Sequence, residues 1–238
     1  MLLLLGCLDR LLEAPYVLTA GFGEARSLAI SREGALLVAG TQGIARISET
    51  ATATVIGADP VDAIAVNPTH LYALADGVLT VEGVTVPVPG AVDIAASWNP
   101  ELWVLYPDRI ELLATDLTST RLVSGLAGAR AVNLGPQSEM LVTLATEVRA
   151  YDAVGASRSI VGGLVDARMA AADESGRVYV VQGSPSELFR VDDGQLTLIA
   201  RFLDDPRDLQ FGRGQLLPRT FAYFATGNGR VDYVVVPL

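Results

Sequence analysis

Short apolar runs broken by polar turns extend along the whole chain. The breaks are rich in Gly, Pro, Asn and Asp, and this punctuation is typical of β-strands joined by tight turns. No apolar run approaches the roughly 18 residues that a membrane-spanning helix requires. The pattern therefore predicts a protein built from stacked β-sheets.

One segment recurs six times along the chain. Each copy is a short apolar strand with small residues in it, preceded by one or two charges and followed by a polar turn. Aligned on Leu28, Ile64, Ile94, Val132, Met169 and Leu209, the copies are spaced by 36, 30, 38, 37 and 40 residues. A period of about 20 to 50 residues indicates a solenoid, a propeller or an array of repeats.

The segments between the copies complete the repeat. Three further short strands follow each of the first five copies, which predicts four-stranded antiparallel blades. Only two follow the sixth, and a strand at Tyr16–Ala20 is available to complete that blade and remove two exposed sheet edges. Alanines concentrate in the recurring strands, where blades converge on an axis. We therefore predict an all-β, six-bladed β-propeller over residues 16–238, closed by its N-terminal strand.

The repeat resembles the group of six-bladed propellers that includes NHL-type, streptogramin-lyase-like and gluconolactonase-like proteins. The resemblance covers about residues 16–238 and rests on the repeat pattern. It implies the propeller fold and a ligand site around the mouth of the central channel. Gluconolactonase-like enzymes bind a divalent metal there through Glu, Asn and Asp.

Residues 1–15 form a separate segment with two interpretations. Leu4, Gly6 and Cys7 resemble the end of a bacterial lipoprotein signal peptide, which implies lipidation of Cys7 and a cell-envelope location, in the periplasm or at the outer membrane. Alternatively, the leucines of this segment form one face of a short helix that lies against the propeller.

Composition limits the classes of partner and site that we expect for this protein. The net charge is −10 and the pI is about 4.5, so the surface repels phosphate backbones and we expect no nucleic-acid partner. One cysteine excludes an internal disulfide, and one histidine excludes a histidine-rich metal site. We expect a monomer that contacts membranes only through a lipid anchor on Cys7.

Charged residues precede the recurring strands and predict a charged channel mouth. These residues are Arg26, Asp62, Asp93, Arg130, Arg168, Arg207 and Asp208. In one interpretation they pair between blades and fix the ring. In the other, the arginines hold a small anionic ligand. Asp62 and Asp93 are candidate ligands for Ca²⁺, and no other cofactor is expected.

The sequence offers little for catalysis. His70 falls in a turn expected on the opposite face, and there is no Ser-His-Asp set or nucleophile elbow. We therefore expect a non-catalytic binding or scaffold propeller for a protein partner or a small anion. The alternative is a metal-assisted hydrolase or lyase of the gluconolactonase-like or streptogramin-lyase-like kind, which would use Asp62, Asp93 and Asp208. A third interpretation is a scaffold that takes up an extended peptide strand.

Overall fold

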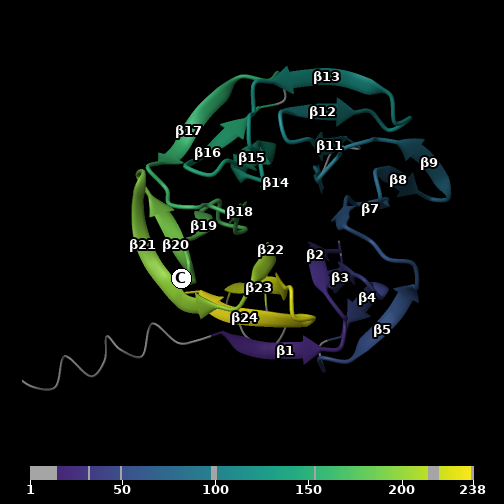
Figure 1. Ribbon diagram of the computed structural model, residues 1–238, viewed down its shortest axis with the longest axis horizontal. Coiled ribbons are helices and arrows are strands. Elements are labelled where there is room, and N and C mark those ends of the chain that lie inside the picture. The colour runs from purple at the N-terminus through teal and green to yellow at the C-terminus, as the bar shows by residue number, and fades with distance from the viewer. Residues whose placement is uncertain are drawn as a thin grey trace, which may run out of the picture.

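A computed structural model describes residues 15–31, 33–48, 50–97, 101–152, 154–213 and 220–236. Over these residues the strands form six four-stranded antiparallel sheets, arranged as blades around a central axis (Figure 1). The predicted six-bladed β-propeller is confirmed. Within the same residues, no helix has the length and apolar character needed to cross a membrane.

The first strand of each blade lies at the axis and the fourth at the outer wall (Figure 1). Blade 1 contains β2 (Ala25–Ile30), β3 (Leu36–Gly40), β4 (Gly43–Ile47) and β5 (Ala53–Gly57). Blade 2 contains β6 (Ala63–Val66), β7 (Leu71–Ala75), β8 (Val78–Val81) and β9 (Val84–Pro87). Blade 3 contains β10 (Asp93–Ala96), β11 (Leu102–Leu105), β12 (Arg109–Leu113) and β13 (Ser119–Ser124).

The remaining blades follow the same plan. Blade 4 contains β14 (Ala131–Leu134), β15 (Met140–Thr143), β16 (Glu147–Tyr151) and β17 (Ser157–Gly162), with a short 3-10 turn at Pro136–Ser138. Blade 5 contains β18 (Met169–Ala172), β19 (Val178–Gln182), β20 (Ser186–Asp192) and β21 (Gln195–Leu203). Blade 6 contains β22 (Pro206–Arg213), β23 (Thr220–Thr226), β24 (Arg230–Val236) and, from the other end of the chain, β1 (Tyr16–Ala20).

Blade 6 closes the ring, because its strands come from both ends of the chain. We call this junction, through which β1 leads on into blade 1, the seam. β1 pairs antiparallel with β24, with Tyr16 opposite Tyr233 and Ala20 opposite Arg230, and the two tyrosine rings stack at 5.4 Å. Just past β1, the N–H groups of Gly21 and Phe22 both donate to the carbonyl of Gly229. The predicted closure by the N-terminal strand is confirmed.

The hydrophobic core lies between neighbouring blades. Tyr72 and Leu74 of blade 2 pack with Leu102 and Val104 of blade 3, and all four are buried. Equivalent clusters join the other neighbours, including blades 6 and 1 across the seam. Burying apolar area stabilises a fold by about 25 cal/mol per Å², so every blade depends on both neighbours. Small residues line the axis, and Ala29, Ala65 and Ala95 are almost fully buried there.

The strand register changes the predicted alignment in blade 5. In blade 5, the backbone N–H of Arg168 donates to the Val181 carbonyl, and Met169 pairs with Val181. In blade 4, the backbone N–H of Arg130 donates to the Thr143 carbonyl in the same way, and Ala131 pairs with Thr143. Ala170, and not Met169, is therefore the equivalent of Val132. The alignment of the fifth repeat on Met169 was wrong by one residue.

Candidate functional site

The two faces of the ring carry different chemistry. We call the face that holds the loops leading into the first strands the rim face. The face that holds the turns between first and second strands is the funnel face. By register, the equivalent residues at the rim end of the first strands are Arg26, Asp62, Val92, Arg130, Arg168 and Arg207.

The predicted charged mouth thus separates into two levels. Arg26, Asp62, Arg130, Arg168 and Arg207 lie at the rim. Asp93 and Asp208 lie one residue further along their strands, where the equivalent residues are Ser27, Ala63, Ala131 and Met169. Blade 3 has no charge at the rim, because Val92 stands there and is 45% exposed. The expectation that every blade presents a charge at this position was wrong for blade 3.

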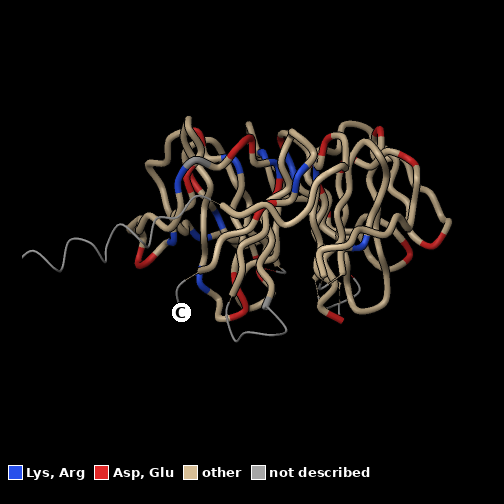
Figure 2. The backbone as a smooth tube through the Cα atoms, turned by 90° about the horizontal axis from the view of Figure 1, so that it is seen from below, with Lys and Arg blue, Asp and Glu red and all other residues tan. Residues whose placement is uncertain are grey.

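The rim charges form one continuous arc of ion pairs over five blades. Starting at blade 2, the arc alternates between carboxylates and guanidiniums, with each neighbouring pair within 4.0 Å. Its members in order are Asp62, Arg26, Glu24, Arg207, Asp205, Arg168, Asp166 and Arg130. Figure 2 shows basic and acidic segments interleaved along this face.

Each arginine of the arc is paired with at least one carboxylate. The Arg26 guanidinium donates to both Glu24 and Asp62, and its pKa is raised, first by the bond to Glu24. Arg130 donates to Asp166 and to the Ala167 carbonyl, and it lowers the pKa of Asp166. Four arginines face four carboxylates, so the arc carries no net charge. This arrangement matches the ion-pair interpretation of the sequence and weakens the case for a bound anion.

Asp93 and Asp208 bind backbone at the inner edges of the first strands. One oxygen of Asp93 accepts the N–H of Ile94 at 2.8 Å, and the other accepts Val132 of blade 4 at 2.9 Å. Asp208 likewise accepts Leu209 at 2.7 Å and, across the seam, Leu28 of blade 1 at 2.7 Å. These N–H groups have no neighbouring strand, and each would cost about 1–3 kcal/mol if left unpaired.

Both carboxyls are harder to ionise than usual. Burial raises the pKa of Asp93 to about 8, and repulsion from Asp208 adds to the rise, while the N–H groups of Val132 and Ile94 oppose it. Burial also raises the pKa of Asp208 to about 6, against bonds from Leu28, Leu209 and Ser27. The cause is the removal of water from a charged group inside the ring.

The Asp62–Asp93 calcium hypothesis finds little support in this geometry. The oxygens of Asp62 accept bonds from Arg26 and from the N–H of Asp76. Both oxygens of Asp93 already accept backbone N–H groups. Within the residues that the structure describes, no three His, Cys, Asp or Glu side chains group as a metal site. The carboxylate pair does not fit a shared Ca²⁺ ion.

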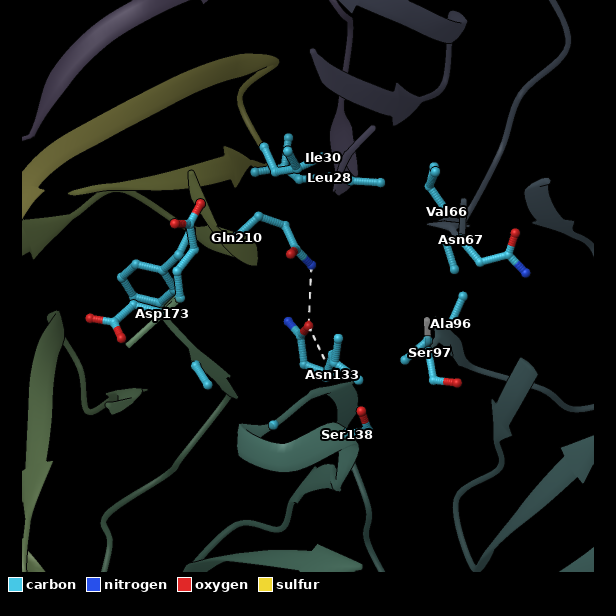
Figure 3. A pocket seen from close by; sticks show the side chains of 18 of the residues that line it. Leu28, Ile30, Val66, Asn67, Ala96, Ser97, Asn133, Ser138, Asp173 and Gln210 are labelled. Atoms are coloured by element: carbon cyan, nitrogen blue, oxygen red, sulfur yellow. Dashed lines mark hydrogen bonds between the residues drawn. The ribbon is translucent and has the colours of Figure 1, made fainter. Parts of the chain in front are cut away.

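The funnel face holds a cavity that the sequence did not reveal. The cavity has a volume of about 800 Å³ and descends along the first strands to the level of Leu28, Ile64 and Ile94. Its size falls within the range of sites for small ligands. Figure 3 shows apolar side chains from several blades, among them Ile30 and Val66, around a central opening.

A polar pair lies deep in this funnel. Gln210 Nε2 donates to Asn133 Oδ1 at 3.3 Å (Figure 3). Asn133 Nδ2 donates to the Leu209 carbonyl at 3.0 Å. Asn133 Oδ1 also accepts the N–H of Leu134 at 2.9 Å. At the equivalent position the other four blades carry alanines, namely Ala29, Ala65, Ala95 and Ala171. The pair joins blades 4 and 6, which lie on either side of blade 5, where the equivalent residue is Ala171.

The polar residues at the funnel mouth mainly hold their own turns. Asn67 Oδ1 accepts the N–H groups of Thr69 and His70, and Asp173 Oδ1 accepts those of Ser175 and Arg177. Asp173 is also paired with the Arg177 guanidinium at 2.7 Å. Such turns follow from short polar side chains that bond to backbone two to four residues ahead. These groups are structural rather than chemically available.

The predictions for Cys7 and the rest of residues 1–14 fall outside the described residues. Lipidation of Cys7 stays a prediction, which mass spectrometry of the mature N-terminus tests. His70 lies in the β6–β7 turn, away from the rim, and its Nδ1 is 2.7 Å from Thr69 Oγ1.

Comparisons with known proteins establish the fold alone. No family model matches the chain, and no curated protein matches it. Among solved structures, a gluconolactonase from Xanthomonas campestris is similar, with a TM-score of 0.74 at 13% identity over 92% of this chain and 88% of that one. Streptogramin B lyase gives 0.60 at 11% identity over 93% and 96%. The WD40 repeats of RRP9 give 0.70 at 10% identity over 94% and 99%.

Proposed function

We propose that this propeller is a non-catalytic binding protein that holds a small ligand in the funnel. The observation that carries the proposal is the cavity of about 800 Å³, whose lining combines apolar side chains such as Ile30 and Val66 with polar groups, and which has an uncharged amide pair at depth. Concave sites of this size that combine apolar side chains with fixed polar groups are the usual binding sites for small ligands.

The remaining polar chemistry of the ring supports binding rather than turnover. The rim arginines are engaged by carboxylates, and the channel carboxyls hold backbone N–H groups. A general base must reach its substrate proton directly or through one water. Neither Asp93 nor Asp208 lines the funnel.

A blocked funnel tests this proposal. Ala96 lines the cavity, so Ala96→Trp should fill it, whereas Val165→Trp adds the same ring at a side chain that is 70% exposed. In a thermal-shift screen of small metabolites, we expect compounds that stabilise the parent and Val165→Trp but not Ala96→Trp. Binding stabilises by mass action. Hits that act equally on Ala96→Trp, or that are recovered chemically changed, would contradict the proposal.

A metal-assisted hydrolase or lyase is the second candidate, favoured by the likeness to a gluconolactonase and a streptogramin lyase. Calorimetric titration with Ca²⁺ separates the two candidates. Because Asp62 and Asp93 already accept hydrogen bonds at all four oxygens, we expect no saturable heat. Heat that disappears in Asp62→Asn and Asp93→Asn would favour the enzyme.

A further inference from the structure

The first strands of the blades turn an open backbone edge towards the axis. In each of them, alternate residues exchange hydrogen bonds with the second strand, and the residues between direct both their N–H and their C=O groups at the axis. These axis-facing residues form two rings. The lower ring contains Leu28, Ile64, Ile94, Val132, Ala170 and Leu209. The upper ring, two residues further towards the funnel mouth, contains Ile30, Val66, Ala96, Leu134, Ala172 and Phe211.

Side chains satisfy the lower ring and leave the upper ring open. Asp93 accepts two of the lower-ring N–H groups, Asp208 accepts two more, and Ser27 Oγ accepts a fifth. In the upper ring, Asn133 Oδ1 accepts the N–H of Leu134. Within the described residues, no side chain or neighbouring backbone accepts the other upper-ring N–H groups. Every upper-ring residue lines the funnel cavity, so these groups face the space that is available to a ligand.

The cavity reaches the lower ring on one side of the axis. Its lining includes the lower-ring residues of blades 1 to 3, but not those of blades 4 to 6. On the side of blades 4 to 6, the hydrogen-bonded side chains of Asn133 and Gln210 line it instead. Figure 3 shows this pair across the opening from Ala96. The open edges that follow the full depth of the funnel are therefore those of β2, β6 and β10.

Of these three edges, that of β10 allows another backbone the closest approach. β10 ends in Ala96, whereas β2 ends in Ile30 and β6 in Val66, and a methyl side chain obstructs a neighbouring strand least. Three backbone groups are open along this edge. They are the N–H and the C=O of Ala96 and the C=O of Ile94, since Asp93 holds the Ile94 N–H.

This edge fits an extended peptide. The N–H and C=O groups on one edge of a strand repeat every two residues, about 7 Å apart, and the open groups of Ile94 and Ala96 have this repeat. A second strand carries donors and acceptors at the same spacing. The charged residues of the described lining, Asp173 and Glu174, both lie on the turn after β18, at the mouth. Burying a charge without a partner is costly, so the depth favours an uncharged segment.

We propose that the funnel binds an uncharged peptide segment in extended conformation, paired antiparallel with the inner edge of β10. One ligand residue exchanges both of its backbone hydrogen bonds with Ala96. The ligand N–H two residues further along donates to the Ile94 carbonyl. Adding a strand to a sheet edge is a general mode of peptide recognition, and here the edge lies inside the ring. This inference rests on the proposed binding function and names its ligand class.

Backbone methylation of a probe peptide tests the pairing in the unaltered protein. The probes are acetyl-alanyl-valyl-alanine methylamide, the same peptide N-methylated at both alanines, and the peptide N-methylated at every amide. Alternate N–H groups of an extended strand lie on opposite edges, so the second probe keeps one open edge and the third keeps none. In NMR titrations of isotope-labelled protein, we expect the first two to bind alike and to shift the Ala96 amide proton downfield. The third should bind at least tenfold more weakly.

Two proline variants test the place of the pairing. Proline lacks an N–H and is tolerated at a strand edge, where that N–H makes no ladder bond. Ala96→Pro removes the proposed donor, and we expect the unmethylated peptide to bind at least tenfold more weakly. Ala172→Pro makes the same change in the upper ring of blade 5, where the cavity does not reach the lower ring, and should keep the affinity within about twofold. Melting temperatures of both variants check that they fold.

The outcomes separate the ligand class from the site. A fully methylated peptide that binds as tightly as the unmethylated one would overturn the strand pairing, and so would equal affinities for the two folded proline variants. If the unmethylated peptide shifts no funnel resonance at millimolar concentration, the ligand class fails. The binding function is decided separately, because compounds from the thermal-shift screen that require an open funnel would preserve it even then.

Discussion

Several single side chains in this protein act by accepting hydrogen bonds from backbone N–H groups. Asp208 accepts two backbone N–H groups and the Ser27 hydroxyl, and Ser27 Oγ in turn accepts the N–H of Ile64. A short relay of side chains therefore joins blades 6, 1 and 2 at their inner edges. Every one of the 17 basic residues is arginine, and its planar fork suits pairing with carboxylates.

The raised pKa of Asp93 gives a prediction about pH. The folded protein holds a proton that the unfolded chain, with an ordinary aspartate pKa near 3.9, releases. The stabilisation from this group is therefore complete below about pH 4 and is lost as pH rises towards about 8. Urea unfolding at pH 5, 6, 7 and 8 should show stability falling with pH.

The variant Asp93→Asn isolates this contribution. It removes the titrating proton, so the fall in stability between pH 5 and pH 8 should become shallower, whatever its absolute stability. The exposed Asp59→Asn makes the same chemical substitution at a surface position and should keep the parent slope. A parent that gains stability over this range, or equal slopes in both variants, would contradict the assignment of the proton to Asp93.

At the level of elements, tight turns bring neighbouring segments into contact at the seam. Gly229 has a φ of 77° in the β23–β24 turn, and a Cβ there would collide with the carbonyl oxygen of Gly23. Gly194 has a nearly equal φ of 76° in the β20–β21 turn, but a Cβ there would meet nothing within 4 Å. The two glycines separate backbone strain from steric contact.

Alanine substitution at these glycines should give unequal costs. Gly194→Ala carries the left-handed strain alone, about 1 kcal/mol. Gly229→Ala adds the collision with a backbone atom and should cost about 1–3 kcal/mol more. Chemical denaturation of both variants measures the difference. Equal costs would show that the Gly23–Gly229 contact relaxes freely.

Strand β1 should be required for the closed ring. Deleting residues 1–22 removes its pairing with β24 and exposes an edge that can associate. If the loss is about 3 kcal/mol, the melting temperature falls by roughly 10 °C for a domain of this size. Deleting residues 1–14 keeps β1 and should leave the melting temperature near that of the parent. A 1–22 deletion as stable and as monomeric as the 1–14 deletion would contradict this role.

The sequence predicted the blades well and did not predict the funnel cavity. The repeat in strand length and turn chemistry was sufficient to assign the fold and the closing strand. It failed in blade 5, because Met169–Ala172 is almost wholly buried, so neither face of the strand differs in polarity to mark its register. The funnel was missed because Asn133 and Gln210 are 77 residues apart, and nothing local to either residue indicates that they meet.

At the scale of the whole molecule, the two faces of the ring differ in their balance of acidic and basic residues. The rim arc balances four arginines with four carboxylates, whereas the described funnel turns carry an excess of acidic residues. The residues predicted at the channel mouth therefore form ion pairs or accept backbone hydrogen bonds, and they hold the blades of the ring together. The recess that remains for a ligand lies on the opposite face.

The rim arc should stabilise without binding. The double variant Arg130→Ala/Arg168→Ala removes the blade 4 and blade 5 cations of the arc. Because these pairs are partly exposed, we expect a loss of about 0.5–2 kcal/mol, smaller at high salt. Ligands found in the thermal-shift screen should bind the double variant as tightly as the parent. Binding lost with stability unchanged would place the ligand at the rim instead.

The seam in blade 6 also sets an order of events during synthesis. Strand β1 leaves the ribosome before the other strands of the propeller, yet its partner β24 is the last of these strands to appear. Until β24 has been made, β1 lacks the partner with which it pairs in the closed ring. A chaperone that shields this strand, or a neighbouring nascent chain that captures it, would act before the ring can close.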